Sequence, residues 1–194
     1  MRKNLLVKTA VALALAAPLL ASAESQFVVG GSSSASAKLD FRVVIPRVLF
    51  LGVGTGAAAL STTGTVDRLT FDYTTNPNTI GSGAAAASIT NTGGFAGNAF
   101  PVRVFGNNGQ VQLAAAGGPN LTSGTDTIPF TQITGTSDST NLPYPVLGAA
   151  AVNVAASAGK VTDRTANWTF AYANTVAAPA GTYNGQVTYT ASMP

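Results

Sequence analysis

The 194-residue chain contains no cysteine and no histidine. Histidine is the commonest general base of enzymes, and cysteine and histidine together supply the usual ligands of zinc. Their absence excludes a Ser-His-Asp triad, a thiol nucleophile and a Cys/His metal site. No disulfide can support the fold either, but a domain of this length can bury enough apolar surface without one.

Charge is also scarce, since only 9% of the residues are charged. Two carboxylates that the fold brings together could still hydrolyse a glycoside, so a secreted hydrolase stays open as a third hypothesis. Asp126 and Asp138 each stand alone in a polar loop, where capping a turn is the favoured role over binding calcium. The Gly-rich run at 52–56 is followed by no Lys-Ser/Thr pair, so it is not a phosphate loop. We expect no enzyme, no cofactor and no metal.

Residues 1–23 have the pattern of a secretory signal peptide. Arg2, Lys3 and Lys8 precede an apolar run, and Ala21-Ser22-Ala23 supplies small residues for cleavage. The run is too short and wrongly flanked for a stable membrane span, and no later stretch is long enough. We therefore expect Glu24 to begin an exported chain with no membrane span, located in the periplasm, on the cell surface or outside the cell.

The signal peptide also accounts for the basic balance of the whole chain. Its three cations are among ten basic residues, which leaves seven basic against seven acidic residues in the remainder. A neutral mature chain gives no reason to expect a nucleic-acid partner or an anionic membrane surface.

The mature chain reads as a series of short alternating strands separated by Gly, Pro, Asn and Thr turns. Strong strand patterns occupy residues 39–45, 48–53, 66–73 and 100–105, and no convincing helix follows the signal peptide. The predicted fold is all-β, an immunoglobulin-like antiparallel β-sandwich of about eight to ten strands. It would form one domain over residues 39–194.

Two β-hairpins are expected. In the first, residues 100–105 and 110–113 flank Gly106-Asn107-Asn108-Gly109, a sequence suited to a tight turn. In the second, the aromatic run 168–172 and the run 183–191 are joined by a Pro/Gly connection. The aromatics of residues 168–172 share one face, for which packing in the core is favoured over a sugar-stacking platform.

Residues 24–38 form an N-terminal arm with a Gly/Ser-rich centre. Such a segment is either a flexible leader or a strand that lies in another molecule. Its odd positions form one series that continues in phase into the strand predicted at 39–45. The members of the series are Phe27, Val29, Gly31, Ser33, Ala35 and Ala37.

The ending Ala180-Gly181-Thr182-Tyr183-Asn184-Gly185-Gln186-Val187-Thr188-Tyr189 resembles the last strand of bacterial fimbrial subunits. With the signal peptide and the arm, the chain resembles a chaperone–usher pilin. That resemblance implies an incomplete sandwich whose missing strand is donated by the arm of the next subunit. It implies that the odd positions of the arm are the donated face, and that Tyr183, Val187 and Tyr189 lie in the strand beside the acceptor site.

The leading functional hypothesis is therefore a structural subunit of a surface filament or fimbria that assembles by β-strand addition. The implied partners are copies of itself or related subunits, with a periplasmic chaperone and an outer-membrane usher. The alternative is a monomeric carbohydrate-binding or adhesin module that uses the loops at 117–126 and 136–145.

Overall fold

The computed structural model describes residues 25–31 and 34–193. The predicted signal peptide, Glu24 and Ser33 lie outside the described residues. The chain divides into two units, Met1–Ile45 and Pro46–Pro194. Every strand among the described residues belongs to the second unit, which we call the body.

The body is all-β, as the sequence predicts. The elements are β1 (Leu49–Val53), η1 (Gly54–Ala57), β2 (Leu69–Asp72), η2 (Pro77–Thr79), β3 (Ser88–Asn91), β4 (Ala99–Gly106), β5 (Val111–Gly117), β6 (Asn120–Ser123), β7 (Asp126–Pro129), η3 (Phe130–Gln132), β8 (Ile133–Ser137), β9 (Val152–Val154), β10 (Thr162–Tyr172) and β11 (Val187–Ser192). The η elements are single 3-10 turns. The described residues contain no helix long and apolar enough to cross a membrane.

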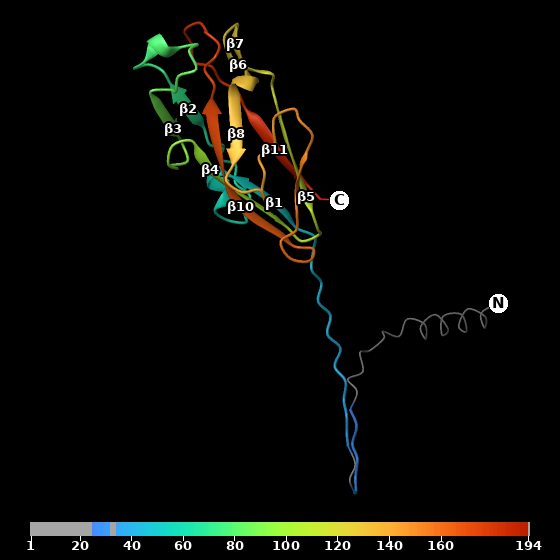
Figure 1. Ribbon diagram of the computed structural model, residues 1–194. Coiled ribbons are helices and arrows are strands. Elements are labelled where there is room, and N and C mark those ends of the chain that lie inside the picture. The colour runs from blue at the N-terminus through green and yellow to red at the C-terminus, as the bar shows by residue number, and fades with distance from the viewer. Residues whose placement is uncertain (1–24, 32–33, 194) are drawn as a thin grey trace, which may run out of the picture. The chain divides into compact units, whose positions relative to one another are not determined.

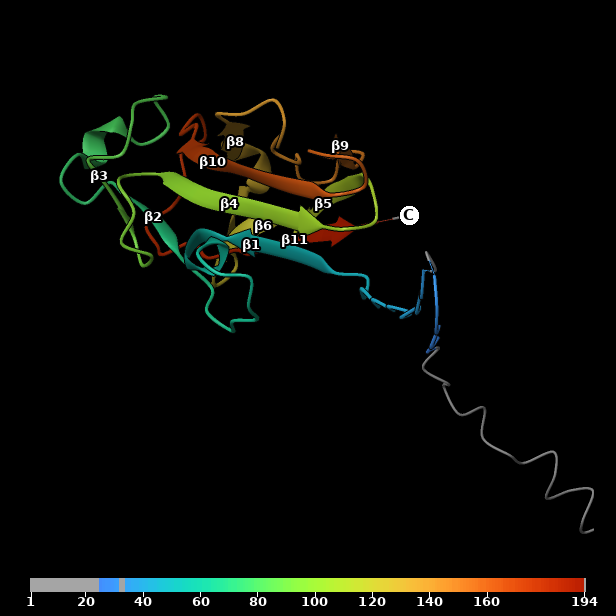
Figure 2. The ribbon, with the colours of Figure 1, turned by 90° about the horizontal axis from the view of Figure 1, so that it is seen from below.

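Every paired strand runs antiparallel to its neighbour (Figures 1 and 2). One sheet has four strands in the order β1-β4-β10-β8, and a second has three in the order β11-β5-β9. Two smaller sheets, β2-β3 and β6-β7, complete the body.

One hydrophobic core lies between the four-stranded and the three-stranded sheets. Alternate residues of β4 and β10 supply one side of it, and alternate residues of β5 and β9 supply the other, as period-2 side-chain placement requires. The fully buried members are Val102, Val104, Trp168, Val111, Leu113 and Val154. Leu142, from the segment between β8 and β9, is also fully buried and closes the core beside Trp168.

Neither predicted hairpin forms. β4 and β5 belong to different sheets, so the turn at 106–109 carries the chain from one sheet to the other. β10 and β11 are likewise in different sheets, and the strand predicted at 183–191 begins only at Val187. Alternating residues face one core in both arrangements, so the pattern alone does not distinguish a hairpin from a crossing between layers.

The strand predicted at 39–45 is also wrong. Residues 38–48 have no assigned secondary structure, and all of residues 39–45 are exposed. The residues alternate as the sequence shows, but none of residues 39–45 is paired with a described strand.

Candidate functional site

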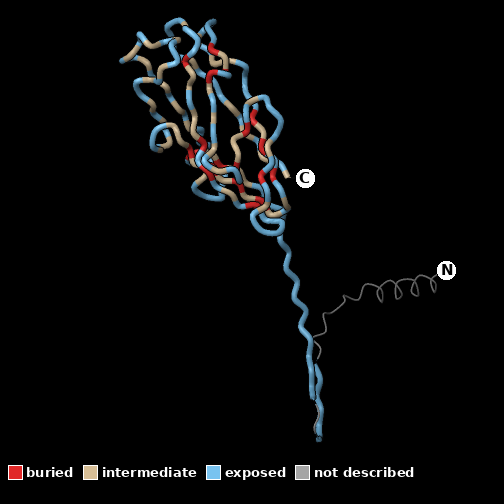
Figure 3. The backbone as a smooth tube through the Cα atoms, in the orientation of Figure 1, coloured by how far each residue is buried: buried red, intermediate tan, exposed pale blue. Residues whose placement is uncertain are grey.

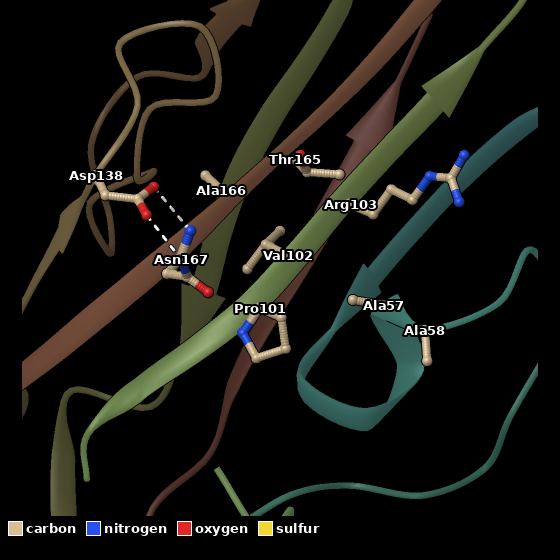
Figure 4. Close-up of a pocket in the computed structure, with 9 residues that line it drawn as sticks. All are labelled: Ala57, Ala58, Pro101, Val102, Arg103, Asp138, Thr165, Ala166 and Asn167. Carbon is tan, nitrogen blue, oxygen red and sulfur yellow. Dashed lines mark hydrogen bonds between the residues drawn. The ribbon is translucent and has the colours of Figure 1, made fainter. Parts of the chain in front are cut away.

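A hollow of about 360 Å³ lies on the outer face of the four-stranded sheet (Figure 4). The side chains of Asn167, Asp138 and Arg103 in it already have partners. The backbone N–H and the side-chain amide of Asn167 donate to the two carboxylate oxygens of Asp138, each at 2.8 Å. Arg103 makes a two-pronged ion pair with Asp163 at 3.1 Å. The bonds from Asn167 lower the pKa of Asp138, so this carboxylate is a stable ion rather than a proton donor.

The body also has two neighbouring edge strands, β1 and β11, whose outer sides pair with no described strand. β1 and β11 are the outer strands of the two facing sheets, and each pairs with one neighbour only. An outer strand presents unpaired N–H and C=O groups along its free side. The two strands approach each other, and Figure 2 shows them running in opposite directions. We call this pair the β1–β11 edge.

The core is poorly covered along this edge. Leu51 and Val53 of β1 and Tyr189 of β11 pack against the core, yet they are only half-buried, and Leu49 is 37% exposed. One strand further in, Val104 and Leu113 have no exposure at all. On the opposite side of the body Leu142 is fully buried, whereas the cover here is partial: Met193, just after β11, packs against the core, and its carbonyl accepts from Arg47 Nη2 at 2.7 Å.

Tyr189 anchors the β1–β11 edge to the aromatic core. Its ring centroid lies 5.0 Å from that of Trp168 and 6.1 Å from that of Tyr144. Burial raises the pKa of Tyr189, and its hydroxyl lies 3.5 Å from the Tyr144 hydroxyl. Tyr189 therefore stays neutral, and its ring packs against the core at this edge.

The first unit contains large apolar side chains that are exposed to solvent. Leu39, Phe41, Val43 and Ile45 alternate along an extended segment and are 73%, 85%, 81% and 76% exposed (Figure 3). Large apolar patches that remain exposed mark interaction sites. We call residues 39–45 the apolar segment.

The predicted donor residues lie before this segment. Phe27 and Val29 are 91% and 82% exposed, and Gly31, Ala35 and Ala37 are exposed as well. The stretch is not one straight strand, because Gly30 and Gly31 have positive φ angles of 103° and 48°. The Ser36 N–H donates to the Gln26 side-chain carbonyl at 3.1 Å, across this turn. After Phe27 and Val29, the next large apolar residues in phase with the series are those of the apolar segment. Their alternation was visible in the sequence but indicated a strand of the body itself.

Of the three residues predicted to lie in the C-terminal strand, two lie in β11 and one precedes it. Val187 and Tyr189 lie on β11, whereas Tyr183 precedes the strand and donates from its hydroxyl to the Pro179 carbonyl at 2.8 Å. Tyr183 is thus occupied in the connection between β10 and β11.

The two loops of the alternative hypothesis are mostly structural. Residues 117–126 form much of the β6–β7 hairpin, whose Thr122 bridges to Asn184. Residues 136–145 contain Leu142, which is buried, and the Ser137 hydroxyl donates to the Leu142 carbonyl at 2.7 Å. Trp168, the first aromatic of the proposed sugar platform, is fully buried, which confirms its assignment to the core.

Comparison with known proteins assigns no relative to this chain: no family model, no curated protein and no solved structure matches it.

Proposed function

We propose that the protein is an exported structural subunit of a bacterial surface filament that assembles by β-strand addition. Its body is an immunoglobulin-like β-sandwich that is incomplete along the β1–β11 edge. The observation that carries the proposal is the coexistence in one chain of an incompletely covered edge and an exposed, alternating apolar segment.

The two features are complementary in chemistry. An added strand would satisfy the free N–H and C=O groups of an edge, and its alternate side chains would complete the core. Burying each large apolar side chain of the apolar segment would contribute about 1.5–3 kcal/mol. Until assembly, both features need protection from water, which is the role that a periplasmic chaperone and an outer-membrane usher would have as partners.

The phase of the alternation provides the test. Phe41→Ser with Val43→Ser removes two residues of the proposed buried face, while Arg42→Ser with Val44→Ser changes the opposite face of the same segment. We expect the first pair to prevent filament formation, measured by light scattering and electron microscopy, and the second pair to permit it. Equal effects of the two pairs would contradict strand addition through this face.

A further inference from the structure

The hollow on the outer face of the four-stranded sheet has one wall that belongs to no sheet. η1 lies directly on the outer face of β1 because Gly52 has no side chain: a Cβ atom there would come within 2.8 Å of Ala57 Cα. The turn is also tied to Asp67, whose Oδ2 accepts from the Thr55 N–H at 2.7 Å and from the Thr55 hydroxyl at 3.1 Å. These contacts hold Ala57 and Ala58 against one side of the hollow (Figure 4).

β4 and β10 form the floor of the hollow. Arg103 pairs with Thr165 across the two strands, and Pro101 pairs with Asn167. Asp138, which follows β8, lies on the side opposite η1 (Figure 4). The volume of about 360 Å³ is at the lower end of the roughly 300–1,000 Å³ that is typical of small-molecule sites. The hollow therefore has room for one small molecule or for the end of a longer one.

The hydrogen bonds of the polar side chains fix their positions but leave them able to bind more. Arg103 donates to Asp163 from Nε and Nη2, and its Nη1 has no partner among residues 25–31 and 34–193. Asn167 donates from Nδ2, while its Oδ1 accepts from no described group and is directed away from Asp138 (Figure 4). The Thr165 hydroxyl likewise has no partner in the described part of the chain. Because Arg103 and Asn167 are already held in place, a ligand would lose less entropy in ordering them.

These groups determine which class of ligand fits. Asp138 is ionised, because the bonds from Asn167 lower its pKa, so it can only accept hydrogen bonds. The Arg103 guanidinium can only donate them. A simple anion would offer no donor to Asp138, a simple cation would offer no acceptor to Arg103, and an apolar ligand would leave both kinds of group unpaired. Hydroxyl groups both donate and accept, so a neutral ligand with several hydroxyl groups satisfies the whole set.

We propose that the hollow binds the terminal ring of a neutral saccharide. Hydroxyl groups of the ring accept from Arg103 Nη1 and donate to Asn167 Oδ1 and Asp138. The C–H groups of the ring contact Pro101 and Ala57. The rim of the hollow is exposed, so the rest of a longer saccharide extends into solvent. The proposal goes beyond the proposed function and does not depend on it, but a filament would repeat the hollow in every subunit and bind a glycan-covered surface through many weak contacts.

NMR titration of the isotopically labelled protein measures both the place and the strength of binding. The probes are the methyl glycosides of glucose, galactose, mannose and N-acetylglucosamine, together with glucuronate, which has the glucose ring with a carboxylate. We expect at least one neutral glycoside to shift the amide signals of Ala57, Ala58 and Thr165 in a saturable manner. Glucuronate should bind more weakly than that glycoside, because its carboxylate offers no donor to Asp138.

Two variants and their matched controls locate the ligand. Ala58→Trp fills the hollow from its exposed rim and should abolish binding, whereas Ala171→Trp, at an exposed alanine of β10 outside the hollow, should not affect it. Thr165→Val removes one hydroxyl with little change of shape and should weaken binding about threefold to tenfold, the effect of one hydrogen bond. Thr134→Val, at an exposed threonine of β8, is its control. Thr165→Val keeps the test decisive if Ala58→Trp does not fold.

Three outcomes would overturn the proposal. The first is that no probe shifts the amides that line the hollow. The second is binding that persists unchanged in Ala58→Trp or in Thr165→Val, since the ligand would then lie elsewhere. The third is tighter binding of glucuronate than of every neutral glycoside, which would make the ligand an anion. None of these results bears on strand addition, which the substitutions in the apolar segment test separately.

Discussion

Asn174 shows how a single polar residue holds the body together. It is 1% exposed and has a φ of 52°, a left-handed conformation that asparagine tolerates better than most residues. Its side chain accepts from the Gly81 N–H and donates to the carbonyls of Thr79 and Ala84, at 2.8–2.9 Å. It therefore joins the chain after β10 to the loop between β2 and β3.

Replacing Asn174 should destabilise the body because the hydrogen bonds of its side chain are lost. Asn174→Ala leaves the Gly81 N–H without its partner and removes one of the donors to each of the Thr79 and Ala84 carbonyls, and we expect a loss of about 1–3 kcal/mol in the free energy of unfolding by urea. Asn174→Gly loses the same bonds but relieves the left-handed backbone, so it should be the milder change by about 1 kcal/mol. An alanine variant as stable as the original chain would rule out this role.

Asp138 makes a pH-dependent contribution at the same scale. Its pKa is lowered from 3.8 by the backbone and side-chain bonds from Asn167. A carboxyl group whose folded pKa is lowered stabilises the fold above its unfolded pKa, and that contribution is lost as the pH falls through the folded value. Asp138→Asn should therefore flatten the decline of stability below pH 3.8, measured by urea unfolding across that range. Asn167→Ala removes only the side-chain bond and keeps the larger backbone one, so it should flatten the decline less than Asp138→Asn does. A decline unchanged in Asp138→Asn would contradict the assignment.

At the scale of elements, the sequence predicts the strands better than their partners. The alternation in β4, β5, β10 and β11 indicates which side chains are buried, and Val102, Val104 and Trp168 are buried accordingly. Which strands pair with each other depends instead on the conformation of the turns and on the sheet to which each strand belongs. Asn107 and Gly109 suit a hairpin, but their turn crosses between sheets instead, with Gly109 at a φ of 102°.

The candidate site was predictable only in part, for the same reason. The in-phase alternation from Phe27 to Ile45 is visible in the sequence, but its division into a turn at Gly30–Gly31 and an exposed apolar segment is not. The incomplete cover of the β1–β11 edge depends on which strands end each sheet, and no local pattern encodes that order.

The two parts of the arm should differ in their contribution to assembly. Deleting residues 26–37 removes the turn and its small side chains but leaves the apolar segment, and we expect the truncated chain still to form filaments in electron micrographs. Deleting residues 39–45 should abolish them. If the first deletion alone prevents assembly, the donated face lies at Phe27–Ala37, as the resemblance to pilins implies.

At the scale of the whole molecule, the body has an incompletely covered edge and the N-terminal segment has apolar side chains that no described residue covers. Along the β1–β11 edge, Leu51, Val53 and Tyr189 pack against the core but stay half-buried, and the side chains of the apolar segment are exposed. Joining the two across molecules would finish both, and repetition of that step would produce a polymer.

The most direct measurement adds a synthetic peptide of residues 37–46 to a chain that begins at Pro46. The account predicts a rise in the thermal unfolding temperature that saturates with peptide, together with slower amide exchange in β11. A peptide with serine at positions 41 and 43 should have neither effect. Stabilisation by both peptides alike, or by neither, would contradict the claim that the apolar segment completes the β1–β11 edge.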